Sequence, residues 1–158
     1  HKVRVINANG DLSRFESYGL PVIPDSLAGW PGPLAGILSC LDWLAQFHCE
    51  CDLLLSCATD APFISSDLAF RLLEARTAEN ATLAQARSSG RRHPVFGLWP
   101  VSIRQDLRTA LIEDGLRKID DFTDRFSLAI ADFSGHPDPF SNVNQPDDIA
   151  AAEAYFES

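Results

Sequence analysis

The chain has 158 residues, of which 46% are hydrophobic and 22% are charged. This composition is typical of a single globular domain and excludes a disordered or fibrous protein. Acidic residues outnumber basic ones by 22 to 13, which gives a net charge of −9. Because a reader of the nucleic-acid backbone needs a basic surface, we expect no nucleic-acid partner. No apolar run approaches the ~20 residues of a membrane span, so we expect no membrane association.

Four cysteines lie close together, at positions 40, 49, 51 and 57. Cys49 and Cys51 are separated by one residue, which is too close for the usual zinc knuckle, although His48 lies beside them. We therefore expect reduced, partly buried thiols in a cytoplasmic protein rather than a zinc site. We also expect the chain to be a monomer.

The first residues of the chain already have a strand pattern. The sequence contains no methionine, and residues 1–6 alternate as a β-strand would. We therefore expect that His1 is not the natural start and that the native chain begins earlier.

Glycines and prolines separate strand-like from helix-like segments, which predicts an α/β layered fold. One helix is expected where apolar side chains recur with helical spacing, and Gly36 in its first turn suggests a close approach to the backbone there. The apolar positions of this helix are Leu34, Leu38, Leu41, Leu44 and Phe47.

The remaining elements follow from the same patterns, with a loop expected at residues 29–33 and another at 88–92. Ser65 or Ser66 is expected to cap the helix that follows the strand at 53–58. In chain order we expect strands at 3–6, 21–24, 53–58, 81–86, 94–99 and 128–133, and helices after residue 66, at 102–113, at 118–126 and from Pro146.

The run 53–58 is apolar on both faces, which is typical of a central parallel strand covered by helices. Asp60 follows this strand directly, and ligands of open α/β sheets bind beyond the carboxyl ends of strands. A carboxylate there suits Mg²⁺, which takes one or two protein oxygens together with substrate phosphates. Asp60 could equally be a turn residue that binds nearby backbone amides.

Other polar residues near strand ends are weaker candidates, each with a structural alternative. Asn7 follows the first strand, and Asp25 has the pattern of a turn or cap. Gly32 and Gly36 flank the start of a helix, where a ligand could lie against the backbone.

The C-terminal half offers two further candidates. Asn142 and Asn144 lie on one side of an extended segment, where they could bind a metal or substrate or simply cap the helix at Pro146. His93 could contact substrate or be a structural histidine at a strand end.

Basic residues are distributed unevenly. The stretch between Arg14 and Arg71 contains no lysine or arginine, although it holds most of the candidate site. If the ligand is a nucleoside triphosphate, its remaining charge must be neutralised elsewhere, and we favour a segment before His1. The alternatives within the chain are Arg91, Arg92, Arg117 and Lys118.

Six short motifs occur along the chain: residues 7–9 (NAN), 22–26 (VIPDS), 32–36 (GPLAG), 60–63 (DAPF), 93–100 (HPVFGLWP) and 142–148 (NVNQPDD). In this order and spacing they resemble the molybdenum cofactor guanylyltransferase family. The resemblance runs over essentially all 158 residues. It implies a three-layer Rossmann-like nucleotidyltransferase fold with a mostly parallel sheet.

The resemblance further implies one nucleotidyltransferase domain over residues 1–158. This domain would lack the N-terminal strand and the glycine-rich loop that holds the triphosphate, so the chain as given would be impaired. Residues 58–59 are Ala-Thr where the family pattern leads us to expect Pro-Cys, and Ala61 replaces the usual Thr or Ser. Neither departure removes the carboxylate of Asp60.

The implied reaction transfers GMP from GTP to the terminal phosphate of molybdenum-molybdopterin and releases pyrophosphate, with Mg²⁺ as cofactor. Molybdoenzyme acceptors or chaperones are implied as further partners. A CTP- or sugar-phosphate nucleotidyltransferase and a non-catalytic carrier of the molybdenum cofactor are the alternatives. The resemblance assigns the guanine nucleotide to Asn7, Asp25, Gly32 and Gly36, Mg²⁺ and catalysis to Asp60, and the pterin substrate to His93, Asn142 and Asn144.

Overall fold

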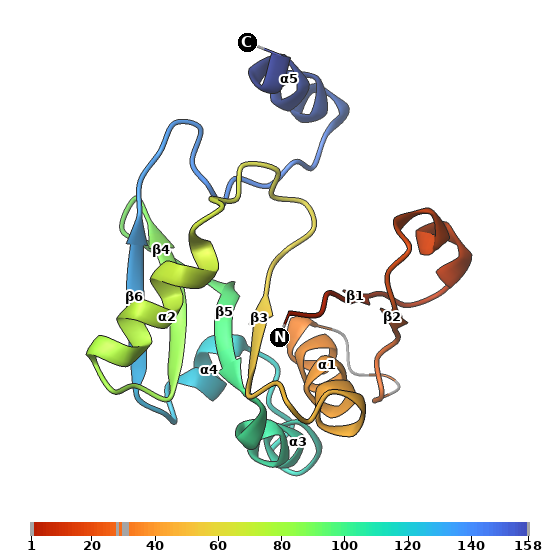
Figure 1. Ribbon diagram of the computed structural model, residues 1–158, viewed down its shortest axis with the longest axis vertical. Coiled ribbons are helices and arrows are strands. Elements are labelled where there is room, and N and C mark those ends of the chain that lie inside the picture. The colour runs from red at the N-terminus through yellow and green to blue at the C-terminus, as the bar shows by residue number, and fades with distance from the viewer. Residues whose placement is uncertain (1, 28, 30–31, 158) are drawn as a thin grey trace. The chain divides into compact units, whose positions relative to one another are not determined.

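The computed structural model describes residues 2–27, 29 and 32–157, and it contains two compact units, each formed by two stretches of the chain (Figure 1). The first unit is His1–Leu54 with Trp99–Ser127, and the second is Leu55–Leu98 with Leu128–Ser158. The loop expected at 29–33 includes Trp30 and Pro31, which lie outside the described residues.

Two short parallel strands begin the first unit. β1 (Ile6–Asn7) pairs with β2 (Val22–Ile23), and β2 lies within the segment expected at 21–24. The strand expected at 3–6 is corrected: β1 shares only Ile6 with that range and includes Asn7. Between them lies a 3₁₀ helix, η1 (Leu12–Tyr18), which the sequence patterns did not predict. The side chain of Asp11 accepts a hydrogen bond from the Ser13 N–H and thereby caps this helix.

Helix α1 (Pro33–Phe47) forms where the apolar spacing predicted it. Pro33 suits the first turn, where the N–H that it lacks has no helical partner. Leu34, Leu38, Leu41 and Leu44 are buried as expected. Phe47 is 60% exposed, so its place on the buried face is corrected: it is the last residue of the helix, and its ring lies near that of Trp43.

Helix α1 packs within the first unit against α3 (Arg104–Ile112) and the 3₁₀ helix η2 (Val101–Ile103). The helix predicted at 102–113 is therefore η2 followed by α3, and α4 (Ile119–Thr123) is shorter than the predicted 118–126. Asp42 of α1 forms ion pairs with Arg104 and Arg108 of α3.

A four-stranded sheet has the order β3-β5-β4-β6. Its strands are β3 (Leu53–Ser56), β4 (Leu83–Ser88), β5 (Arg91–Pro100) and β6 (Leu128–Phe133). β4 runs parallel to β6 and antiparallel to β5. The α/β class is confirmed, but strand directions in this sheet are more mixed than expected, because β4 and β5 form a hairpin. β3 is at one end of this order and only half-buried, so its predicted central, fully covered position is wrong.

The turn of this hairpin is tighter than the loop expected at 88–92. Ser88 pairs with Arg91, which leaves Ser89 and Gly90 as the two turn residues. Both have positive φ, 49° and 75°, as a two-residue turn of the primed type requires. The sequence pattern predicted that the first strand ends at residue 86 and that the second begins at residue 94. Both strands extend closer to the turn, because polar residues such as Ser88 and Arg91 also take part in the strand pairing.

Helix α2 (Leu68–Ala78) packs on β4 and β6 in the second unit (Figure 1). Leu68 and Leu72 are buried beneath it. The N-cap residue is Asp67, not Ser65 or Ser66, and the Ser65 hydroxyl instead donates to the Asp67 carboxylate.

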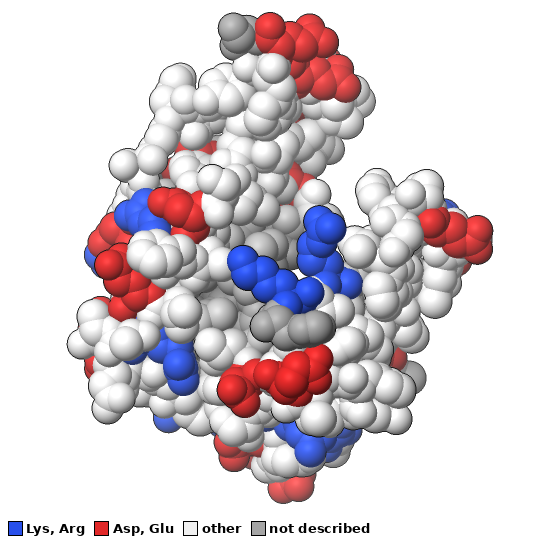
Figure 2. All heavy atoms as spheres, viewed as in Figure 1, with Lys and Arg blue, Asp and Glu red and all other residues white. Residues whose placement is uncertain are grey.

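The final helix, α5 (Pro146–Glu157), begins at the predicted proline. Tyr155 and Phe156 of this helix lie against Phe63, with ring centroids 5.2 and 5.6 Å from it. No helix within the described part of the chain is long and apolar enough to cross a membrane. The face drawn in Figure 2 carries both acidic and basic side chains.

Candidate functional site

Three side chains at the ends of β1 and β2 form an amide–carboxylate cluster, Asn7, Asn9 and Asp25. The Asn7 Nδ2 group donates to Asp25 Oδ1 at 2.9 Å and to the Ile23 carbonyl at 2.9 Å. Asn9 Nδ2 donates to Asp25 Oδ2 at 2.8 Å, and the Asp25 N–H donates to Asn9 Oδ1 at 2.8 Å. The parallel register of the two strands places these groups side by side, and the carboxylate is held on both of its oxygens.

Gly36 of α1 lies against this cluster. A Cβ atom there would stand 2.0 Å from Asn7 Oδ1 and 2.8 Å from Asn7 Cγ, which is far inside van der Waals contact. The predicted close approach to this turn of α1 is confirmed, and the group that approaches is the Asn7 amide. Gly36 is therefore linked to Asp25 through Asn7.

A serine pair ties the segment after β2 to α1. The buried Ser39 hydroxyl donates to the Ala35 carbonyl at 2.8 Å and accepts a 2.7 Å hydrogen bond from the Ser26 N–H. Asp25 is thus held by Asn7 and Asn9 on one side and by its neighbour Ser26 on the other. Gly32 is the N-cap residue of α1.

Asp60 lies in the turn that follows β3. Its backbone carbonyl accepts a 2.7 Å hydrogen bond from the Val143 N–H, so it lies beside the segment that carries Asn142 and Asn144. Its carboxylate has no hydrogen-bond or ion-pair partner among the described residues, and the alternative reading as a turn-capping side chain therefore has no contact to support it. A free carboxylate of this kind is a hard oxygen ligand suited to Mg²⁺.

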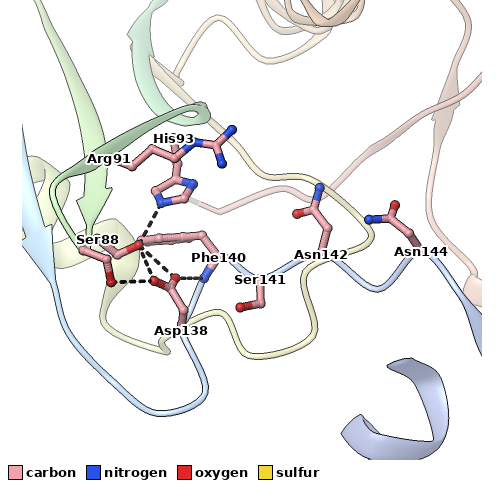
Figure 3. A pocket seen from close by; sticks show the side chains of 9 residues that line it. Ser88, Arg91, His93, Asp138, Phe140, Ser141, Asn142 and Asn144 are labelled. Atoms are coloured by element: carbon pink, nitrogen blue, oxygen red, sulfur yellow. Dashed lines mark hydrogen bonds between the residues drawn. The ribbon is translucent and has the colours of Figure 1, made fainter. Parts of the chain in front are cut away.

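A pocket of about 520 Å³ lies entirely within the second unit (Figure 3). The predicted residues His93, Asn142 and Asn144 all line it, although they come from β5 and from the segment before α5. The other lining residues are Ser88, Ser89, Arg91, Asp138, Phe140 and Ser141.

Ser88, His93 and Asp138 form a hydrogen-bonded chain at one side of the pocket (Figure 3). Ser88 Oγ lies 2.7 Å from His93 Nε2 and 2.8 Å from each oxygen of Asp138. The Phe140 N–H donates to Asp138 Oδ1 at 2.9 Å, and the Ser89 hydroxyl donates to Oδ2 at 3.2 Å.

The environment lowers the pKa values of both His93 and Asp138. Burial and the nearby charge of Arg91 lower the pKa of His93, against an opposing contribution from Asp138. Burial alone would raise the pKa of Asp138, but hydrogen bonds from Phe140, Ser88 and Ser89 and the charge of His93 lower it. At neutral pH the carboxylate is therefore ionised and the imidazole is neutral.

The side chains of Asn142 and Asn144 project from the segment that leads to α5 (Figure 3). Their amides make no hydrogen bond with any residue in the described ranges. The backbone N–H groups of Asn144 and Gln145 donate instead to Asp148 Oδ2, at 3.0 and 2.9 Å, so Asp148 caps α5. The two asparagine amides are consequently available to a ligand.

The structure thus brings the predicted residues together in two groups. Asn7, Asp25 and Gly36 meet in the first unit, and His93, Asn142 and Asn144 meet in the second, with Asp60 bonded to the segment of the asparagines. Sequence reasoning missed Asn9, although its spacing of two from Asn7 was a usable signal. It also missed Ser88 and Asp138, for which no local signal exists because they are 50 residues apart.

Two of the four cysteines, Cys40 and Cys57, have thiols whose pKa is raised by burial. All four are free, and no cluster of three or more His, Cys, Asp or Glu side chains suited to a metal is found in the described part of the chain. Burial, with a smaller contribution from Asp25, raises the pKa of Cys40 to about 11. Burial also raises the pKa of Cys57.

Comparison with known proteins gives concordant results. The family model described as the MobA-like NTP transferase domain matches residues 2–126. The chain is 50% identical over 149 residues to the molybdenum cofactor guanylyltransferase of Rhodopseudomonas palustris (strain BisB5), covering 94% of this chain and 71% of that protein. It is 49% identical over 150 residues to that of Bradyrhizobium sp. (strain ORS 278), with the same coverage of 94% and 71%.

A solved structure supports the fold. Molybdopterin-guanine dinucleotide biosynthesis protein A from Archaeoglobus fulgidus superimposes with a TM-score of 0.72 over 97% of this chain and 78% of its own. The two sequences are 22% identical, so this likeness concerns the fold alone.

Proposed function

The chain belongs to the molybdenum cofactor guanylyltransferase family, and from this we propose that its two groups of site residues bind the two substrates of guanylyl transfer. The chain is a nucleotidyltransferase whose reaction is GTP-dependent guanylyl transfer that forms the molybdopterin guanine dinucleotide cofactor. In the reaction that we propose, a terminal phosphate oxygen of molybdopterin attacks the α-phosphorus of GTP in line. The bond to the β-phosphate breaks, and pyrophosphate leaves.

This chemistry asks the protein for positioning and charge neutralisation. The attacking phosphate is already ionised near neutral pH, so the reaction needs no strong general base. The raised pKa values of Cys40 and Cys57 also argue against either of these two thiols as a nucleophile. Rigidly held binding groups are therefore the features that matter most.

We assign the guanine nucleotide to the amide–carboxylate cluster and the first turn of α1. Asn7 and Asp25 hold each other in one orientation, and the oxygens of the Asp25 side chain keep lone pairs for further N–H or O–H donors of a nucleotide. Gly32, at the exposed N-cap, carries no side chain, so a base or ribose could lie against it. Gly36 contributes indirectly, because its missing side chain leaves room for the Asn7 amide that holds Asp25. This assignment is supported by the mutual hydrogen bonds of the cluster.

We assign Mg²⁺ to Asp60. Its carboxylate fits the ion because it is a hard oxygen donor with no protein partner among the described residues, and Mg²⁺ commonly takes one carboxylate together with phosphate oxygens. When bound, the ion would neutralise charge on the triphosphate and on the transferring group. Asp60 is then the catalytic residue of our proposal.

We assign the pterin substrate to the pocket lined by His93, Asn142 and Asn144. Its volume of about 520 Å³ lies within the range of small-molecule sites. The two free asparagine amides and the imidazole offer hydrogen-bond donors and acceptors to a polar heterocycle.

The test of this proposal is the substitution Asp60→Asn, which keeps the shape of the side chain and removes its charge. We expect loss of at least about 100-fold in molybdopterin guanine dinucleotide formation, because the metal ligand is lost. Asp52→Asn is the matched control, since Asp52 lies just before β3 and Asp60 lies just after it. Circular dichroism should show the same fold for both variants, and near-normal turnover of Asp60→Asn would overturn the metal assignment.

The same assay separates the two alternatives. Substitution of CTP for GTP should reduce product formation, whereas equal or better use of CTP would indicate a cytidylyltransferase. A non-catalytic carrier would form no dinucleotide with either nucleotide, yet would still support activation of an acceptor molybdoenzyme.

Three further assignments complete the proposal. We propose one nucleotidyltransferase domain, because the family match at residues 2–126 includes parts of both units and strands β3 and β5 continue from one unit into the other. We propose a cytoplasmic location, in keeping with four free thiols. We propose a monomer whose further partners are molybdoenzyme acceptors or chaperones.

A further inference from the structure

The hydrogen-bonded chain in the pocket determines which nitrogen of His93 carries the proton. Asp138 is ionised at neutral pH and can only accept, so the single Ser88 hydroxyl proton points to Asp138. Ser88 Oγ then has only lone pairs to offer to His93 Nε2, which lies 2.7 Å away. That contact is a hydrogen bond only if Nε2 is protonated.

The reverse arrangement is unfavourable. If Ser88 donated to His93, its oxygen would face both Asp138 oxygens at 2.8 Å with no proton between them. Ser88 is only 2% exposed, so water has little access to compensate for that loss. The chain therefore runs from His93 Nε2–H to Ser88 Oγ and from Ser88 O–H to the Asp138 carboxylate.

The other ring nitrogen is left for a ligand. His93 Nδ1 makes no hydrogen bond with any described residue, and the imidazole is held in place by Phe140, with ring centroids 4.7 Å apart. In the neutral Nε2–H form, Nδ1 has a lone pair and is an acceptor.

We propose that Asp138, acting through Ser88, is a positioning residue that keeps the proton of His93 on Nε2 and so presents Nδ1 to the pocket as an acceptor for an N–H group of the pterin. This inference rests on the proposed assignment of the pterin to this pocket. Pterins carry N–H donors on their pyrimidine edge, and an acceptor held by an anchored ring matches such a donor. The free amides of Asn142 and Asn144 can donate or accept further hydrogen bonds to the pterin.

Acidification should convert His93 Nδ1 from a hydrogen-bond acceptor into a donor. The charged groups that face His93 are Asp138, on the segment between β6 and α5, and Arg91, on β5. As the pH falls through the lowered pKa of His93, Nδ1 gains a proton and becomes a donor. The pocket then loses its acceptor for an N–H group and gains a cationic group, which favours an anion such as phosphate.

The experiment is ¹⁵N NMR of the chain labelled at histidine nitrogens, in which protonated and unprotonated ring nitrogens have widely separated shifts. His93→Gln identifies the signals. Unliganded protein at pH 7.5 should show His93 protonated on Nε2. Ser88→Ala and Asp138→Asn should each raise the fraction protonated on Nδ1, whereas Ser89→Ala, which removes a hydroxyl bonded only to Asp138, should leave the tautomer unchanged.

The second part titrates each protein with 6-hydroxymethylpterin and, separately, with inorganic phosphate. We expect the pterin to shift the Nδ1 signal and to bind about fivefold more weakly to Ser88→Ala and Asp138→Asn, as for one lost hydrogen bond. A wild-type His93 protonated on Nδ1, or a tautomer unaffected by either substitution, would overturn the positioning role.

The experiment distinguishes failure of the positioning role of Asp138 from failure of the pterin assignment of the pocket. If the tautomer behaves as expected but the pterin leaves Nδ1 unchanged, the pterin assignment of the pocket is overturned while the positioning of His93 stands. If phosphate shifts Nδ1 at pH 7.5 and the pterin does not, the pocket takes an anion and the acceptor role is wrong.

Discussion

Gly36 of α1 lies directly against the side chain of Asn7 in β1. The Asn7 oxygen occupies the space that a Cβ would fill, while the Asn7 Nδ2 group is bonded to Ile23 and Asp25. The short Asn7 side chain cannot rotate away without breaking those two bonds. Glycine at this position therefore fixes the orientation of the amide that holds the Asp25 carboxylate.

This geometry predicts the result of Gly36→Ala. Alanine normally stabilises a helix by about 1 kcal/mol relative to glycine, but here the added methyl would collide with Asn7. We expect a net loss of about 1–2 kcal/mol in the free energy of unfolding, measured by urea denaturation.

The control is the same substitution in an Asn7→Ala background. With the Asn7 oxygen removed, Gly36→Ala should become neutral or stabilising. An equal effect of Gly36→Ala in both backgrounds would show that the contact with Asn7 is not the cause.

At the scale of elements, the β4–β5 hairpin carries Ser88 and His93, two of the residues that line the pocket of the second unit. The turn Ser89-Gly90 places Ser88 at the end of β4, and His93 lies on the paired strand β5, where it bonds to Ser88. The parallel pairing of β4 with β6 then leads the chain from Phe133 towards Asp138. The hydrogen bonds that connect His93, Ser88 and Asp138 thus depend on both the antiparallel pairing of β4 with β5 and the parallel pairing of β4 with β6.

The turn predicts the effect of Gly90→Ala. Gly90 has φ of 75°, a left-handed conformation that costs a residue with a Cβ about 1–2 kcal/mol. We expect a loss of about that size in the free energy of unfolding, measured from the urea midpoint. Ser89→Asn should maintain or raise stability, because asparagine tolerates positive φ. Equal responses of the two variants would contradict this account of the turn.

At the scale of the whole molecule, net charge opposes self-association. A charge of −9 on 158 residues favours a monomer through repulsion between copies. Against this, Phe70 and Leu73 of α2 are 66% and 43% exposed and give the second unit an apolar strip.

We expect light scattering to give a mass of 17.3 kDa at both low and high salt. High salt screens the repulsion between the negatively charged copies. Any association through the apolar strip of α2 would then be unopposed and would appear as a higher mass. A mass of twice this value would contradict the prediction. If Phe70→Glu then restored the monomer, the α2 strip would be identified as the interface.

The sequence by itself determined the family and the approximate positions of most strands and helices, but not the helix η1 or the ends of β4 and β5. Periodicity is a local property, so α1, α5 and the strand Leu128–Phe133 were predicted closely. The six motifs are also local, and they led to the family and to the candidate residues. The spacing of two between Asn142 and Asn144 is local, so the sequence predicted that they share one side of their segment. The contact between Asn7 and Asp25 joins two motifs 18 residues apart, and only the structure showed it.

Only the tertiary structure decided how those residues are held. The amide of Asn7 against Gly36, the place of β3 at the end of the strand order and the exposure of Phe47 depend on which elements pack together. The bond between Ser88 and Asp138 joins residues 50 apart, and its direction depends on the ionisation of a carboxylate in a partly buried site. Hydrogen-bond partners and proton positions are properties of the packed environment, and a linear pattern of residue types carries no record of them.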